Sequence, residues 1–200
     1  MKITITEKSL KHATHQFIKQ FREDEYAFCS GLKKNANDQT KLLTLNKALA
    51  KFKVARNFRL KYDKGLGYKR FEPVLQIIND LDITSDPVSI VLTIESELSK
   101  SYGGSKFLSA ASKLAWLLTT DEDSFSSVII YDSYACTALK KLGYLTSHHT
   151  YDEYLIAWWD AFNDCEVLIK SVVFLESKKP NLELRAFDLQ LYEIGASYAK

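Results

Sequence analysis

The chain has 200 residues, of which 46% are hydrophobic and 26% are charged, and its formal net charge is +2. This much apolar material supports a buried core, and the low numbers of Gly (7) and Pro (3) argue against a collagen-like, linker-rich or disordered protein. The three cysteines lie far apart without metal-ligand spacing, which argues against a disulfide framework, a zinc site and an iron–sulfur cluster.

The N-terminal residues MKITITEKSLKHATHQ are too polar for a signal peptide, and no apolar run reaches the roughly 18 residues of a membrane span. We therefore expect a cytosolic protein that forms one compact helical domain over residues 1–200. Two lobes, at about 1–84 and 85–200, are compatible with the pattern, although no clear linker separates them.

The first predicted helix ends at a stop signal, Gly31. Its apolar side chains recur at steps of three, four and seven residues: Leu10, Ala13, Phe17, Phe21 and Phe28. A second helix is predicted to begin near Asp38, and the stretch KGLGY at 64–68 breaks it into a turn. A short helix is expected after Pro73.

Ser85-Asp86-Pro87 is typical of a helix start with proline in the first turn, and Gly103-Gly104 is typical of a helix end. The β-branched residues between them are also compatible with a strand, but the length and the flanking signals favour a helix. Further helices are predicted over residues 105–118, 132–142, 151–176 and 182–198. With no repeats and no alternating strand pattern, the predicted fold class is all-α.

Positive charge is concentrated from Lys51 to Arg70, where eight Lys or Arg residues accompany one acid, Asp63. Such a run suits a nucleic-acid backbone, because each neutralised phosphate releases condensed counterions. A solvated helix face is the common alternative. The aromatic residues within the run fit either a core stripe or base stacking.

Standard catalytic motifs are absent: the sequence has no Walker loop, dinucleotide fingerprint, G-x-S-x-G or H-E-x-x-H. The adjacent pair His148-His149 lacks a third metal ligand, and His12 and His15 are interpreted as structural. Cys136 is interpreted as a small buried apolar residue, because no partner histidine is evident. We expect no metal and no cofactor.

Lys113 is unusual because it follows the small residues 109–112 and precedes the apolar run LAWLL. Small residues allow another backbone to approach closely. Such a lysine either extends to solvent from the edge of a core helix or serves as a nucleophilic amine. A position on the outer surface would exclude the enzymatic role, whereas a cleft shared with Asp132 would support it.

Asp132 follows the apolar step VIIY and precedes SYACTAL, which is the pattern of a helix N-cap. Capping alone explains such a residue and is worth about 1 kcal/mol. A capping aspartate can also direct one oxygen into a cleft, where it stabilises an oxocarbenium-like sugar or transfers a proton.

The segment 109–139 resembles the catalytic segment of helix-hairpin-helix DNA glycosylases, in particular the 8-oxoguanine DNA glycosylase branch. It has small residues before Lys113, an apolar helix, a loop and an extended step, with Asp132 19 positions after the lysine. The resemblance implies a two-lobed helical fold in which Lys113 attacks the sugar C1′, expels the base and forms a Schiff base. Asp132 would assist.

The hairpin that normally precedes this lysine has a Leu-Pro-Gly-Val-Gly type turn whose amides hold a DNA phosphate. This chain has KFLSAASK there, and Gly103-Gly104 lie ten and nine residues before Lys113. The resemblance is therefore to the smaller bacterial relatives with a divergent or missing hairpin, and it does not identify the base that is excised.

The resemblance further implies a monomeric DNA glycosylase or AP lyase that binds double-stranded DNA containing a modified base, in repair or in defence against modified foreign (phage) DNA. The target base must leave the stack before its C1′ can be reached. Candidate contacts to phosphate and base are Arg56, Arg59, Lys69, Arg70, Tyr131, Tyr134 and Gln190. Core packing is the alternative role for the two tyrosines and for most of the last helix.

A second hypothesis belongs to another class. The chain would be a non-enzymatic helical DNA-binding or protein-interaction module of a bacterial defence or mobile-element system, and Lys113 and Asp132 would be structural. The environment of Lys113 separates the two hypotheses.

Overall fold

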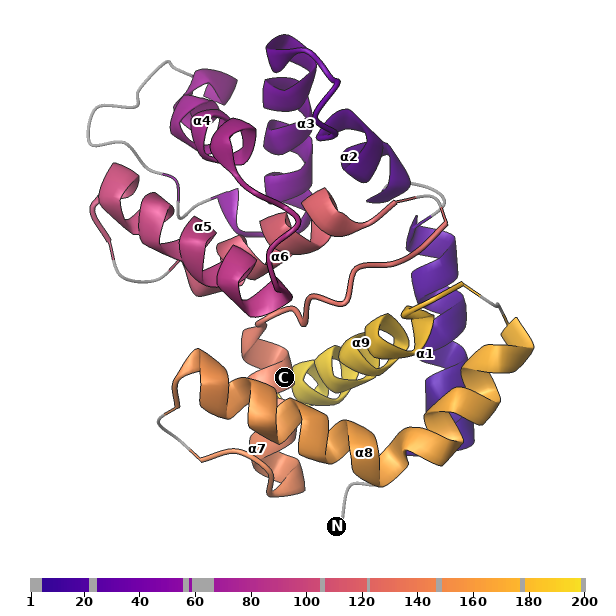
Figure 1. Cartoon of the computed structure of the whole chain (residues 1–200). Coiled ribbons are helices and arrows are strands. Elements are labelled where there is room, and N and C mark those ends of the chain that lie inside the picture. Colours follow the sequence, from indigo (N-terminus) through magenta and orange to yellow (C-terminus); the bar gives the residue numbers. More distant parts are fainter. Residues whose placement is uncertain are drawn as a thin grey trace. The chain divides into compact units, whose positions relative to one another are not determined.

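The computed structural model describes residues 5–21, 25–55, 58, 67–104, 107–121, 123–146, 149–176 and 179–198 (Figure 1). Across these residues the regular secondary structure is helical throughout and no strand occurs, which confirms the all-α fold class. None of the described helices is long and apolar enough to cross a membrane.

The chain divides into two compact units. Unit 1 comprises Met1–Arg22 and Asp123–Lys200, and unit 2 comprises Glu23–Glu122. Unit 1 contains α1 (Glu7–Gln20), α7 (Ser133–Leu142), α8 (Tyr151–Glu176) and α9 (Leu182–Ser197). Unit 2 contains α2 (Tyr26–Gly31), α3 (Asp38–Lys51), the 3-10 helix η3 (Gly67–Phe71), α4 (Glu72–Asp80), α5 (Pro87–Tyr102) and α6 (Leu108–Thr119).

Two helices, α1 and α2, occupy the stretch for which the apolar period predicted one helix. The period continues through both, but Leu10 and Phe17 are buried in unit 1, whereas Cys29 is buried in unit 2. An apolar period indicates that one face of a helix is buried, but it does not indicate which of two cores buries that face. The lobe boundary expected near residue 84 lies inside unit 2, between α4 and α5.

The residues that were predicted to begin and end α5 do so in the structure. The Asp86 carboxylate accepts hydrogen bonds from the amides of Val88 and Ser89 at 3.1 and 3.0 Å. Gly103 ends the helix in the left-handed conformation, with φ of 67°, which favours glycine because it has no Cβ. α5 and α6 pack together on either side of the connection that begins with Gly103.

The core of unit 2 contains α6, whose residues 110–117 are all buried. An aromatic cluster is centred on Phe58, which comes from the basic stretch and is fully buried. Its ring lies 5.6, 5.3 and 5.7 Å from the rings of Phe71, Tyr102 and Phe107. Phe58 is therefore a core residue, and base stacking is excluded for it.

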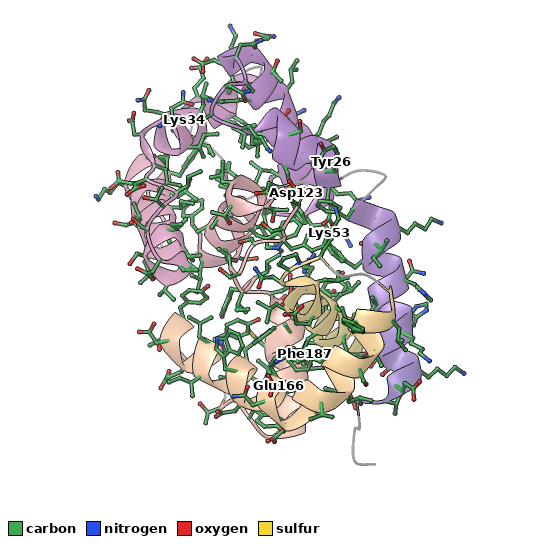
Figure 2. The ribbon with its side chains drawn as sticks, turned by 45° about the vertical axis from the view of Figure 1, so that its right-hand side comes forward. Tyr26, Lys34, Lys53, Asp123, Glu166 and Phe187 are labelled. Carbon is green, nitrogen blue, oxygen red and sulfur yellow. The ribbon has the colours of Figure 1, made fainter. Side chains whose placement is uncertain are left out.

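Helix α9 is the central element of unit 1, and α1, α7 and α8 all pack against it (Figure 1). Phe187 of α9 is fully buried (Figure 2) and contacts Trp158 and Phe162 of α8 at ring distances of 5.0 and 5.5 Å. Trp158 is fully buried and Trp159 is 40% exposed, so only one of these adjacent tryptophans belongs to the core.

α9 approaches α7 closely at Gly195. A Cβ atom added there would fall well inside the contact distance of the Tyr134 carbonyl oxygen and the backbone atoms next to it. Backbone atoms cannot move aside as a flexible side chain can, so the contact requires glycine. The first turn of α7, which follows Asp132, is therefore held directly against α9.

We expect Gly195→Ala to destabilise unit 1 by about 1–3 kcal/mol, because the added methyl overpacks a backbone contact. The direction of the change in unfolding free energy tests the contact, because replacing glycine by alanine inside a helix otherwise stabilises the protein by about 0.5–1 kcal/mol. Urea unfolding measures the change, with Ser197→Ala in the exposed last turn of α9 as control. Stabilisation by Gly195→Ala would contradict the close approach.

Candidate functional site

Lys113 is buried, with 7% of its surface exposed, in the middle of α6. Its Nζ donates a hydrogen bond to the hydroxyl of Ser109, one turn earlier, at 3.2 Å. A buried ammonium group needs such partners because it has left water. Lys113 is thus not a solvent-facing lysine, the position that would have excluded a catalytic role.

Three of the small residues before Lys113 are buried. Ala110, Ala111 and Ser112 have no exposed surface, and the Ser112 hydroxyl donates to the Ser109 carbonyl at 3.3 Å. Ser109 thus accepts hydrogen bonds from the side chains of both Ser112 and Lys113 on the same helix.

Asp132 caps α7, as its sequence context predicts. Its backbone is extended, with φ −134° and ψ 139°, and its Oδ1 accepts a hydrogen bond from the Tyr134 amide at 2.9 Å. The Asp132 carbonyl accepts the first helical hydrogen bond, from Cys136, also at 2.9 Å. The carboxylate is half-buried at the start of the helix.

The extended segment before Asp132 is held by two tyrosine hydroxyls from α8. Tyr151 donates to the carbonyl of Ile129 at 3.0 Å, and Tyr154 donates to that of Ile130 at 2.8 Å. Buried carbonyls without partners are costly, and no sheet is present among the described residues to supply the donors. The hydroxyls, three residues apart on one helix face, replace a neighbouring strand.

Tyr131 and His149 form the side of the site next to Asp132. The Tyr131 hydroxyl lies 3.0 Å from His149 Nε2, and its ring meets the Tyr154 ring at a centroid distance of 4.9 Å. Burial raises the pKa of Tyr131 to about 12. His149 therefore binds a tyrosine, and His148 lies outside the described residues.

Cys136 follows Asp132 by one helical turn and is buried, as expected. Burial raises the pKa of its thiol to about 11, although the hydrogen bond with Tyr131 opposes this shift. A thiol with such a pKa stays protonated at neutral pH and is a poor nucleophile. Within the described part of the chain, no group of His, Cys, Asp or Glu side chains is arranged to hold a metal ion.

Gln190 on α9 is 3% exposed, and its Oε1 finds no hydrogen-bond donor among the described residues. A buried acceptor without a donor costs about 1–3 kcal/mol. Tyr134 is half-buried, and its ring meets that of Tyr192 edge to face at 5.1 Å.

The candidate phosphate contacts have different surroundings. Arg56 and Arg59 lie outside the described residues. Lys69 is exposed, as a phosphate contact requires. Arg70 is half-buried, and its guanidinium lies 4.7 Å from the centre of the Phe71 ring, a cation–π geometry that ties it to the core of unit 2.

The candidate residues fall into two groups. Asp132, Tyr131 and Tyr134 lie together in unit 1, which also contains Gln190, whereas Lys113 belongs to unit 2. Comparison of the chain with protein-family models, with curated proteins and with solved structures finds no match.

Three supporting residues were not identified from the sequence: Tyr151, Tyr154 and Gly195. The two tyrosines resemble ordinary apolar positions of a long helix, and only their hydroxyl partners reveal their function. An isolated glycine inside a helical pattern is a recognised sign of close backbone approach, so Gly195 could have been found.

We expect Tyr154→Phe to lower the free energy of unfolding by about 1–3 kcal/mol, because the buried Ile130 carbonyl loses its donor. Tyr144→Phe is the matched control, since the Tyr144 hydroxyl bonds to Asp164 at an exposed site. Urea unfolding compares the two variants. Equal effects would show that the buried hydroxyl does not hold the segment before Asp132.

Cys136 should resist alkylation in the folded protein. With a pKa of about 11, roughly one thiol in a thousand is ionised at pH 8. Mass spectrometry after iodoacetamide treatment should find Cys136 unmodified, with half-buried Cys165 as internal reference and urea-unfolded protein as positive control. Native labelling of Cys136 at the unfolded rate would contradict the assignment.

Proposed function

We propose that the protein is a DNA glycosylase that excises a modified or oxidised base through a Schiff base on Lys113, in DNA repair or in defence against modified foreign DNA. The observation that carries the proposal is the burial of Lys113 on an apolar helix, 19 positions before a helix-capping aspartate. The resemblance of segment 109–139 to helix-hairpin-helix glycosylases supplies the reaction class.

In the proposed reaction the Lys113 amine attacks the sugar C1′. The C1′–base bond breaks, and the base leaves with the bonding electron pair and takes up a proton. Opening of the sugar ring then gives the Schiff base between Nζ and C1′. The attacking amine must first lose its proton, so the Ser109 hydroxyl, which accepts a hydrogen bond from Nζ, has a positioning role.

Asp132 would stabilise the positive charge that develops on the sugar. A carboxylate stabilises the transition state strongly only if it is already held in place before the reaction. A mobile carboxylate must first be reoriented, and the free-energy cost of this reorientation reduces the stabilisation. The Asp132 carboxylate is held by its hydrogen bond from the Tyr134 amide. The backbone just before Asp132 is held by the two tyrosine hydroxyls that donate to residues 129 and 130.

Base recognition in this proposal uses residues of unit 1. Gln190 provides a buried acceptor for a donor on the edge of an extruded base, and the rings of Tyr131 and Tyr134 provide flat surfaces beside Asp132. Exposed Lys69 is available for the phosphate backbone.

Borohydride trapping tests the lysine. Duplexes containing 8-oxoguanine, uracil, hydroxymethylated cytosine or an abasic site are mixed with the protein and the reductant, which converts a Schiff base into a stable adduct. We expect an adduct that Lys113→Gln abolishes while DNA binding is retained. Lys47→Gln, at an exposed position of α3, is the matched control. Trapping retained in Lys113→Gln would assign the chemistry to another amine.

Asp132→Asn distinguishes a catalytic role of the Asp132 charge from its helix-capping role, with unfolding and borohydride trapping as the two measurements. Asparagine caps helices as well as aspartate does, so the free energy of unfolding should change by less than about 0.5 kcal/mol. If the carboxylate acts on the sugar, the rate of adduct formation should fall by about 10²–10⁴-fold. An unchanged rate would leave Asp132 with a structural role only.

A second candidate, a protein-interaction module, is favoured by one face of α8. Ile156 and Val167 are 62% and 85% exposed, and they lie on the same side of the helix because they are 11 residues apart. α8 contains one lysine, Lys170, and several acidic residues. The acidic residues whose side chains the structure describes are Asp152, Glu153, Asp160, Asp164 and Glu166. Such a face suits a basic amphipathic helix. Absence of an adduct on every duplex would favour this candidate.

A further inference from the structure

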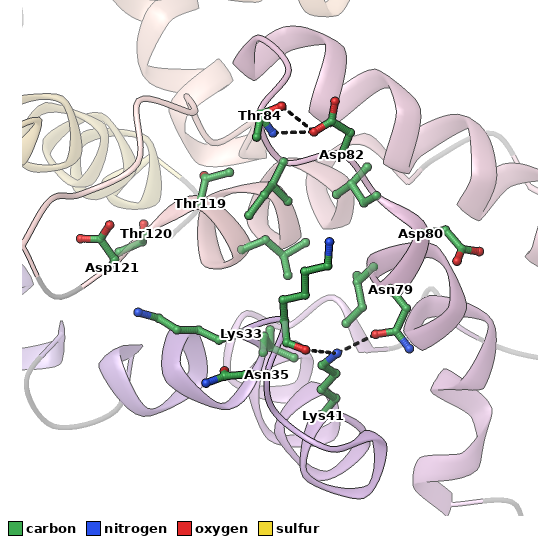
Figure 3. Close-up of a pocket in the computed structure, with 16 residues that line it drawn as sticks. Lys33, Asn35, Lys41, Asn79, Asp80, Asp82, Thr84, Thr119, Thr120 and Asp121 are labelled. Carbon is green, nitrogen blue, oxygen red and sulfur yellow. Dashed lines mark hydrogen bonds between the residues drawn. The ribbon is translucent and has the colours of Figure 1, made fainter.

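A pocket of about 770 Å³ lies within unit 2, and Lys113 is not among its lining residues (Figure 3). It is bounded by the end of α2 and the following loop, the first turns of α3, the ends of α4 and α6, and the loop 81–84. The volume is large enough for a small organic ligand.

Lys41 lines this pocket and is 5% exposed. Its Nζ donates to Asn79 Oδ1 at 2.7 Å and, more weakly, to the Lys34 carbonyl at 3.5 Å. No carboxylate of the described residues forms an ion pair with it. An ammonium group has three donors, so a buried positive charge and one donor remain for a ligand.

Two further lysines, Lys33 and Lys34, line the same pocket from the loop after α2. Both are exposed, and neither forms an ion pair with a carboxylate of the described residues. Three lysines therefore line the pocket, two from the loop 32–37 and one from the first turn of α3.

The nearby carboxylates of Asp80 and Asp82 are engaged within the protein. Asp80 accepts a hydrogen bond from Gln76 at 2.7 Å. Asp82 accepts from the hydroxyl and the amide of Thr84 at 2.6 and 2.9 Å. The Thr84 hydroxyl is the main cause of the lowered pKa of Asp82, and the charge of Lys34 adds to it. The third carboxylate, Asp121, lies after the end of α6.

The rest of the lining is mixed. Apolar contact is available from five side chains: Leu32, Ile78, Leu81, Ile83 and Leu118. Amide and hydroxyl groups of Asn35, Thr119 and Thr120 also line the pocket. An inorganic anion would use the lysines alone, whereas a ligand with an organic body carrying hydroxyl and amino groups would use the whole lining.

We propose that this pocket binds a nucleoside monophosphate, with the phosphate at Lys41, Lys33 and Lys34 and the nucleoside against the apolar wall. Charge-assisted hydrogen bonds make the lysines the anchor for the phosphate. The inference is independent of the proposed glycosylase, because none of these residues takes part in the chemistry at Lys113.

Isothermal titration of the full chain with deoxyadenosine monophosphate, deoxyadenosine and inorganic phosphate tests the site. We expect the nucleotide to bind at least about tenfold more tightly than either fragment, because it alone uses both parts of the pocket. Lys41→Met should weaken nucleotide binding by at least about tenfold, which is the loss of one charge-assisted hydrogen bond. Lys47→Gln, exposed on the same helix, should bind as the wild type does.

If Lys41→Met does not fold, the exposed double variant Lys33→Gln/Lys34→Gln replaces it, with the same direction expected. No binding of the nucleotide, unchanged affinity in these variants, or equal affinity for inorganic phosphate would overturn the proposal. Displacement of the nucleotide by duplex DNA without terminal phosphates would also overturn it, in favour of a DNA-backbone site. Borohydride trapping should be unaffected by Lys41→Met, so failure here is distinguishable from failure of the glycosylase proposal.

Discussion

Hydrogen bonds from two tyrosine hydroxyls to consecutive carbonyls are the interaction on which the site in unit 1 depends. A chain that runs extended through a helical protein exposes backbone groups that helices satisfy internally. Tyr151 and Tyr154 supply the donors for residues 129 and 130, and this places Asp132 where α7 begins. The first turn of α7 is in close contact with α9 at Gly195, which has no side chain to prevent the backbone approach.

Unit 2 shows a different constraint, the burial of lysine side chains. Lys113 and Lys41 are 7% and 5% exposed. A buried ammonium group loses much of its hydration, and neutral hydrogen-bond partners compensate only in part. The roles proposed for these two lysines are chemistry at Lys113 and anion binding at Lys41.

Helix α6 connects these two features within unit 2. Lys113 lies in the middle of the helix, and Leu118 and Thr119 at its end line the pocket that contains Lys41. A ligand in the pocket would therefore contact the element that carries the proposed nucleophile.

The sequence by itself determined the helical class, most helix boundaries and the capping role of Asp132. These features depend on local rules: an apolar period, the proline and capping aspartate before α5, and the glycine after it. For the same reason the burial of Cys136 could be predicted, since its neighbours follow the period of α7.

Only the tertiary structure decided which core each helix joins. The apolar period that runs from Leu10 to Phe28 contains no mark that separates α1 in unit 1 from α2 in unit 2. The depth of Lys113, the partners of Tyr151 and Tyr154, and the gathering of three lysines around one pocket also depend on segments far apart in the chain. Local propensity can place a side chain on a face of a helix, but its burial and its partners are set by what packs against that face.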